Sequence, residues 1–232
     1  MLKRVSWGCV LALALSASAG AQNVIVNGGF ESGGLTGWTR NVWGGSNGDL
    51  RAATGTTGFL SGLPTVGANT GSYYALTDQS GPGAYELSQS FSLSNAASSA
   101  TLSFYLSASN RATTIVGSSL NPFGGFANQH ITVDLFSGSP AAFSTGGLQN
   151  FYLGSQLGVA NPYGLFQFDV TSLLNAPGTY TLRFAEVDNW GYHHMAVDDV
   201  SLDVSTVPEP TTFVLFGAGM AALAVVSRRR RA

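Results

Sequence analysis

The sequence predicts an all-β fold, a two-sheet jelly-roll sandwich, with a signal-peptide helix before it and one short transmembrane helix after it. Residues 22–206 are rich in glycine, serine, threonine, asparagine and aromatic side chains. Short runs that alternate apolar and polar residues are separated there by glycine, asparagine and proline, as in strands joined by turns. Eight or more such runs in one domain favour two packed antiparallel sheets.

Residues 179–187 show the alternation most clearly. Tyr180, Leu182 and Phe184 share one side of this run, and threonine and arginine residues share the other, which predicts a strand with one buried face. Residues 110–128 show no such pattern, and we expect a long loop there. The predicted strands cover residues 24–26, 72–77, 85–93, 100–107, 130–136, 165–170, 179–187 and 194–204.

The N-terminus has the three parts of a secretory signal peptide. Lys3 and Arg4 form a basic start, and residues 5–15 form an apolar stretch. Small residues then provide two possible cleavage positions, after Ala19 and after Ala21. We favour the second, so that residues 1–21 are removed and the exported domain is 22–206.

The C-terminus, residues 207–232, combines a proline motif, an apolar segment and a basic end. Pro208 and Pro210 flank Glu209 and keep the motif extended, since proline disfavours helix in the residue before it. The uncharged segment 211–226 would span about 24 Å as a helix, somewhat less than the ~30 Å core of a bilayer. Four arginines at 228–231 would hold that end in the cytoplasm.

This tail resembles the PEP-CTERM sorting signal of Gram-negative bacteria, and Pro208, Glu209 and Pro210 match its motif. The resemblance implies that an exosortase, a membrane protease-transpeptidase, acts at these three residues. It also implies passage through the inner membrane, transient anchoring by the C-terminal helix, and a final place at the cell surface or in the extracellular matrix.

The charge of the exported domain excludes some partners. Residues 22–206 hold four arginines, no lysine and eleven acidic residues, which gives a net charge of −7. A domain this acidic is not expected to bind nucleic acid. The single cysteine, Cys9, lies in the signal peptide, so the exported domain has no disulfide bonds.

The two ends of the domain carry a second resemblance. Residues 27–31 read Asn-Gly-Gly-Phe-Glu, and residues 198–202 read Asp-Asp-Val-Ser-Leu. Together they resemble the galactose-binding-like jelly-roll domains found in many carbohydrate-binding modules, in which the first and last strands adjoin and often hold a structural calcium. The resemblance implies Glu31 and Asp199 as calcium ligands, completed by backbone carbonyls.

The residues around Asp199 support this interpretation independently. Apolar residues change phase along the last predicted strand near residues 198–199, which predicts a β-bulge that re-aims a side chain. Carboxylate and carbonyl oxygens are the ligands that calcium prefers. The alternative is that Asp198 and Asp199 are solvated carboxylates in a turn.

Aromatic residues in glycine-rich loops are the candidates for ligand binding. Tryptophan and tyrosine can stack on the apolar face of a sugar, while polar side chains bond its hydroxyl groups. Packing in the core is the alternative, and it stays open for Trp190 and Tyr192. Adjacent histidines at 193 and 194 would point to opposite faces of a strand, which disfavours a shared zinc site. The candidate glycan-binding residues are Trp190, Tyr192, Asp188, His193 and Trp43.

We therefore expect a non-enzymatic protein of the surface or exopolysaccharide matrix that binds extracellular polysaccharide. A secreted glycan hydrolase is the first alternative, and it needs two carboxylates about 5–10 Å apart. Glu31, Glu86 and Glu186 stand in no recognisable catalytic motif. A purely structural surface protein without a small ligand is the second alternative.

Overall fold

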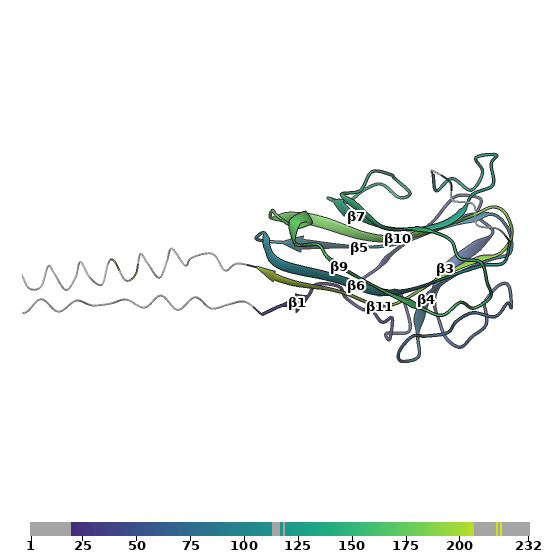
Figure 1. Cartoon of the computed structure of the whole chain (residues 1–232), viewed down its shortest axis with the longest axis horizontal. Coiled ribbons are helices and arrows are strands. Elements are labelled where there is room, and N and C mark those ends of the chain that lie inside the picture. Colours follow the sequence, from purple (N-terminus) through teal and green to yellow (C-terminus); the bar gives the residue numbers. More distant parts are fainter. Residues whose placement is uncertain (1–19, 113–116, 118, 207–216, 218, 220–232) are drawn as a thin grey trace, which may run out of the picture. The chain divides into compact units, whose positions relative to one another are not determined.

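Two antiparallel sheets form the two layers of a β-sandwich between residues Ala21 and Thr206 (Figure 1). The computed structural model describes residues 20–112, 117, 119–206, 217 and 219. The predicted all-β sandwich is confirmed. The predicted signal peptide and C-terminal helix lie almost wholly outside the described residues. Within the described residues, no helix has the length and apolar character needed to cross a membrane.

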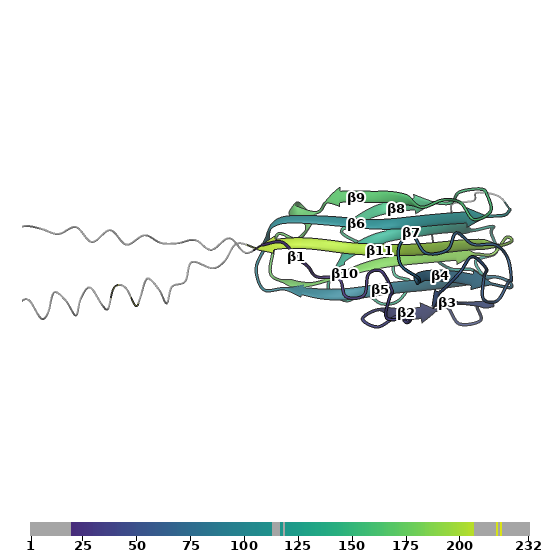
Figure 2. The same ribbon diagram turned by 90° about the horizontal axis from the view of Figure 1, so that it is seen from below.

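Each layer has its longest strands at the centre (Figure 2). The six-stranded sheet has the order β3 (Gly48–Ala53), β4 (Tyr74–Gln79), β11 (His193–Thr206), β6 (Ala97–Asn110) and β9 (Gly164–Asp169), with β1 (Gln22–Asn23) paired to β11. The five-stranded sheet has the order β2 (Thr39–Val42), β5 (Gly83–Leu93), β10 (Gly178–Asp188), β7 (Gln129–Ser137) and β8 (Gln149–Gly154). A 3₁₀ turn, η1, covers Thr171–Leu173.

The central strands were predicted better than the edges. The strands with two neighbours, β4, β5, β6, β7, β10 and β11, all overlap predicted runs, and so does the edge strand β9. The strand expected at 24–26 is wrong in position, because the chain pairs with β11 at Gln22 and Asn23 instead. β2, β3 and β8 were missed: β2 and β8 are edge strands with no fully buried residue, and β3, also at an edge, lacks a regular apolar repeat.

Aromatic side chains fill the space between the sheets. Phe104 of β6 and Phe184 of β10 meet edge-on, with ring centroids 5.2 Å apart. Trp38 lies 6.1 Å from Phe184 and is buried, and its indole N–H donates to the carbonyl of Asn27 at 3.1 Å. This core joins the N-terminal segment to the centre of both sheets.

The predicted bulge in the last strand is present. The register of β11 against β6 shifts between Asp198 and Ser201, and Asp199 adopts a positive φ of 49°. The freed N–H of Val200 donates to the carbonyl of Gly28 at 3.0 Å. A β-carbon on Gly28 would lie 1.9 Å from the Val200 oxygen, so only glycine permits this approach.

The outer face of β10 is buried as well, which corrects the expectation of a strand with one buried face. Arg183 lies there, 2.6 Å from a carboxylate oxygen of Asp134 and 3.6 Å from one of Glu86, with its guanidinium over the ring of Phe136. The connection between β7 and β8 covers this group, since Arg183 also donates to the carbonyl of Ser144 at 2.6 Å.

We predict that Arg183→Met lowers the free energy of unfolding by about 3–5 kcal/mol, because it leaves two buried carboxylates without their cation. Arg51→Met is the matched control. Arg51 pairs with Asp49 on the surface, where such pairs contribute about 0–1 kcal/mol. Urea unfolding of both variants measures the difference, and equal small losses would contradict the assignment of Arg183 as a buried structural cation.

Candidate functional site

The first candidate site is a clasp between the two ends of the domain, made of residues 27–31 and 198–200 and called the terminal clasp here. One oxygen of Glu31 accepts the backbone N–H groups of Ser72 and Tyr73, at 2.9 and 2.7 Å. Gly71, with φ +63°, lies directly under this carboxylate, and an added β-carbon would be 2.5 Å from it. Glu31 thereby holds the turn before β4.

The aspartates of the clasp grip the same turn from β11. Asp198 accepts the backbone N–H of Asn69 at 2.8 Å. Asp199 accepts the side-chain amide of Asn69 and the hydroxyl of Thr70, both at 2.7 Å. Burial, together with the neighbouring charge of Asp199, raises the pKa of Asp198 to about 6. The predicted bulge thus aims Asp199 at the segment that Glu31 also holds.

The clasp contains carboxylate oxygens, which are the type of ligand that calcium prefers. An added β-carbon on Gly29 would lie 3.5 Å from Asp199 Oδ1, and its next neighbours would be Asp198 and Glu31. None of these three carboxylates forms an ion pair within the described chain. Among the described residues, no group of three or more His, Cys, Asp or Glu side chains is placed to hold a metal ion. Carbonyl or hydroxyl oxygens would therefore complete any shell.

The second candidate site is the connection between β10 and β11, residues 189–192. Trp190 is 59% exposed and Tyr192 is 39% exposed, so the core-packing alternative does not describe them. Asp188 accepts the backbone N–H of Trp190 at 3.1 Å and fixes the start of the turn. Asp188 and His193 are themselves fully buried, and they lie beneath the surface that the aromatics present.

Trp43 occupies a different setting. Its ring meets Phe143 edge-on at 5.1 Å, and both pack against a small buried cluster that includes Ala84 and Val187. The structure therefore places Trp43 in a packing role on the outer side of the five-stranded sheet and does not bring its ring into contact with Trp190.

Two further exposed aromatics were not singled out in the sequence. Phe123 is 51% exposed and Phe126 is 86% exposed, both in the stretch expected to be a long loop. Asn189 donates to the carbonyl of Phe126 at 2.7 Å, which ties this loop to the turn that carries Trp190. The sequence does carry a signal for their exposure, because a phenylalanine in a glycine-rich loop has no strand to bury it. Phe123, Phe126, Trp190 and Tyr192 together are called the aromatic end.

A polar pocket of about 230 Å³ lies on the outer face of the five-stranded sheet. Asn150 donates to the carboxylate of Asp134 at 2.8 Å and to the hydroxyl of Thr132 at 2.7 Å. Burial lowers the pKa of His130 to about 4, so the ring is neutral at pH 7. The described lining residues are Gly117, Ser119, Leu120, His130, Thr132, Asp134, Thr145, Gly146, Asn150, Leu153 and Arg183.

Asn128 connects this pocket to the aromatic end. Its amide oxygen accepts the N–H of Gly117 at 3.1 Å and lies 2.8 Å from His130 Nδ1. Its amide nitrogen donates to the carbonyl of Ser119 at 2.6 Å. The backbone of Asn128 also exchanges hydrogen bonds with Asn189. The pocket rim and the Trp190 turn are therefore held by one residue.

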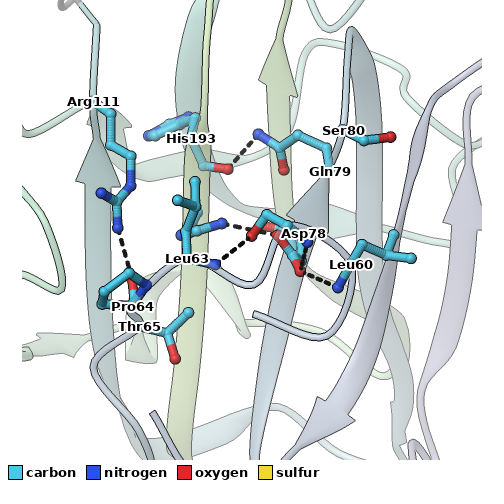
Figure 3. A network of polar contacts seen from close by, with 12 residues as sticks. Leu60, Leu63, Pro64, Thr65, Asp78, Gln79, Ser80, Arg111 and His193 are labelled. Atoms are coloured by element: carbon cyan, nitrogen blue, oxygen red, sulfur yellow. Dashed lines mark hydrogen bonds and ion pairs between the residues drawn. The ribbon is translucent and has the colours of Figure 1, made fainter. Parts of the chain in front are cut away.

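Adjacent histidines point to opposite sides of β11, as expected. His194 turns outward, where its Nε2 lies 3.0 Å from Asp78. Asp78 also accepts the N–H groups of Leu60 and Ser61, and Figure 3 shows the bond to Leu60. Burial acts to raise the pKa of Asp78, but these hydrogen bonds hold it down at about 2. His193 turns inward, toward the buried space between the sheets.

The C-terminal residues 206–231 match the model of the PEP-CTERM protein-sorting motif. The chain therefore carries this sorting motif, as the residues Pro208, Glu209 and Pro210 predicted. No protein of curated function matches the chain in sequence.

Solved structures are similar to this chain at low sequence identity. TmCBM61, solved in complex with beta-1,4-galactotriose, is 14% identical with a TM-score of 0.50, over 78% of this chain and 97% of its own. The CBM22-1 xylan-binding domain from Paenibacillus barcinonensis Xyn10C is 14% identical with a TM-score of 0.43, over 83% and 100%. The Stig cyclase Fisc from Fischerella sp. TAU is 16% identical with a TM-score of 0.49, over 81% and 100%. The first likeness shows a shared jelly-roll fold.

Proposed function

We propose that this protein is an exported, non-enzymatic component of the cell surface or exopolysaccharide matrix, and that it binds glycan at the aromatic end. The observation that carries this proposal is the exposure of Trp190 on a turn whose backbone is held at both ends, at Trp190 by Asp188 and at Tyr192 by the N–H of Arg111. An exposed indole offers a flat apolar face to a sugar ring, and a turn that is already held in place loses little backbone entropy on binding.

The surroundings of Trp190 supply what a sugar needs besides stacking. Tyr192 and Phe126 add exposed rings on the same end of the sandwich. The polar pocket next to them offers hydroxyl, amide and carboxylate groups, contributed by Thr132, Asn150 and Asp134. These groups can bond sugar hydroxyls directly or through water.

The sorting motif supports the route to this location. We propose that residues 1–21 direct export, that 22–206 is the exported domain, and that 207–232 anchors it in the inner membrane until an exosortase acts at Pro208, Glu209 and Pro210. The charge of −7 on the exported domain favours neutral polysaccharide over nucleic acid as its partner.

The placement of the glutamates supports a non-enzymatic role over the hydrolase alternative. Glu86 is buried beside Arg183, Glu186 is fully buried, and Glu31 is bonded to backbone N–H groups in the terminal clasp. Asp134 is the single carboxylate among the described pocket-lining residues, and it is paired with Arg183. A glycosidase needs two carboxylates on either side of a sugar.

We further propose that the terminal clasp holds a structural calcium through Glu31 and Asp199. The ion would bring positive charge to a clasp whose three carboxylates form no ion pair in the described chain. It would also join the first and last segments of a domain that has no disulfide bonds.

The first prediction tests the aromatic end. Trp190→Ala should lower retention on polysaccharide at least about tenfold, because one well-packed aromatic contact is worth more than about 1.4 kcal/mol. Pull-downs of the full chain in detergent use a β-1,4-galactan, a xylan and exopolysaccharide from the producing cells. Leu165→Ala, which removes a 56% exposed side chain from β9, is the control. Equal retention of both variants removes Trp190 from the site, and no retention of the wild type favours the purely structural role.

The second prediction tests the tail. Deleting residues 207–232 should move the protein from the membrane fraction to the soluble fraction, because it removes the apolar segment and the basic stop. Glu209→Ala keeps that segment and alters only the motif, so this variant should accumulate in the membrane unprocessed. Unchanged fractionation of the deletion variant would show that another segment anchors the chain.

The third prediction tests the calcium in the terminal clasp. Gly71→Ala should hold one calcium per chain fewer than the wild type and show a smaller rise in melting temperature when calcium is added after chelator treatment, because its β-carbon displaces Glu31. Gly62→Ala is the matched control. Gly62 has a φ of +67° and nothing within 4 Å of an added β-carbon, so this variant introduces the same backbone strain without a steric clash. If neither calcium nor chelator changes the melting temperature of the wild type, the clasp is not a calcium site.

A further inference from the structure

The space between the sheets becomes polar at the aromatic end. Along β10, Leu182 and Phe184 point into the apolar core, and Glu186 and Asp188 follow in the same inward phase. All four side chains are fully buried. On the facing sheet, Gln79 at the end of β4 follows Ala75 and Thr77 in the same phase, and all three are buried.

One amide group connects the two carboxylates. The nitrogen Nε2 of Gln79 donates to Asp188 Oδ2 at 2.7 Å and to Glu186 Oε1 at 3.4 Å. It also donates to the backbone carbonyl of His193, a bond that Figure 3 shows. Three oxygens from β10 and β11 thus converge on a single point, which lies inside the sandwich beneath the turn that carries Trp190.

The neighbouring side chains bring more oxygens without hydrogen-bond partners. Tyr85 pairs in register with Glu186, and Gln129 pairs in register with Asp188, so each lies beside a carboxylate on the same face. Both are fully buried. The Tyr85 hydroxyl, both amide atoms of Gln129 and Gln79 Oε1 have no hydrogen-bond partner in the described chain. A buried polar atom without a partner costs about 1–3 kcal/mol, which points to a ligand for the group.

No side chain in the described cluster compensates the two carboxylates. Arg183 lies on the same strand but on its outer face, paired with Asp134. The nearest group that could carry a positive charge is the ring of His193, but its Nδ1 is 3.5 Å from Glu186 Oε1 and forms no hydrogen bond in the described chain. Two buried carboxylates without a positive charge are strongly unfavourable.

We propose that a calcium ion binds between the sheets at this point, held by Glu186, Asp188, the amide oxygens of Gln79 and Gln129, and the carbonyl of His193. A half-turn of the Gln79 amide exchanges its nitrogen and oxygen and converts it from a donor into a ligand. The donor set consists of oxygens from two carboxylates, two amides and a carbonyl, which suits calcium. Zinc and copper prefer thiolates and imidazoles, and no cluster of three His, Cys, Asp or Glu side chains in the described chain is placed to hold a metal.

This interior ion is separate from the one proposed for the terminal clasp. It would lie under the aromatic end, where Asp188 already binds the backbone of Trp190 through its other oxygen. Ion binding would therefore fix the turn that presents the indole, and opening of that turn would give the ion its path into the sandwich.

The experiment measures bound calcium in the full chain, purified in detergent, stripped with chelator and returned to calcium. The parent carries Glu31→Gln, so that the terminal clasp contributes no ion. We expect the parent to hold about one calcium per chain, and Glu186→Gln or Asp188→Asn in that background to hold none. Calcium should raise the melting temperature of the parent and leave that of both variants unchanged.

The variants remain interpretable because Glu186→Gln keeps the shape of the side chain while removing its buried charge. In chelator this variant should melt no lower than the parent, which shows that it is folded. Glu86→Gln is the matched control, since this buried carboxylate already has Arg183 beside it, and bound calcium should not change. Failure of the parent to bind calcium, or equal binding by parent and Glu186→Gln, overturns the interior site. Any calcium bound by the wild type would then be assigned to the terminal clasp alone.

Discussion

The closure of this sandwich depends on the hydrogen bond between the Val200 N–H and the Gly28 carbonyl. The bulge at Asp198 and Asp199 frees that N–H from the ladder with β6, and the absence of a side chain on Gly28 lets the backbones meet. This contact seats the N-terminal segment against the central strand of the six-stranded sheet. Trp38 can then reach the core, and Glu31 meets the turn that the aspartates of β11 also hold.

The two ends of the sandwich have different character. At the end where β1 pairs with β11, the core residues Leu202 and Val204 are apolar. At the opposite end the inward positions become Glu186, Asp188 and Gln79, directly under exposed aromatics. Polar residues thus occupy inward positions at the end where the loops present a surface. Such departures from the usual burial of apolar residues are common at functional sites. The proposed glycan surface and the proposed interior ion both belong to this end.

How much could be predicted depended on how strongly burial constrained each residue. Strands with two neighbours, such as β10, carry a clear apolar repeat, whereas the edge strand β8 does not and was missed. Trp190 was identified because a tryptophan among glycine and polar residues is conspicuous in the sequence. Phe126 was not, although it too lies among glycines. Only the structure shows that Asn189, sixty-three positions away, ties its loop to the turn that carries Trp190.

The sequence by itself determined the sandwich class, the sorting tail, the bulge and the segments that form the terminal clasp. These follow from local periodicity, composition and short motifs, which need no knowledge of distant neighbours. Tertiary structure alone decided that Asp188 and His193 are buried below the glycan candidates, and that Gln79, Glu186 and Gln129 share an interior polar space. Which face of a strand is covered, and by what, depends on the packing of two sheets and on the loops that close their ends.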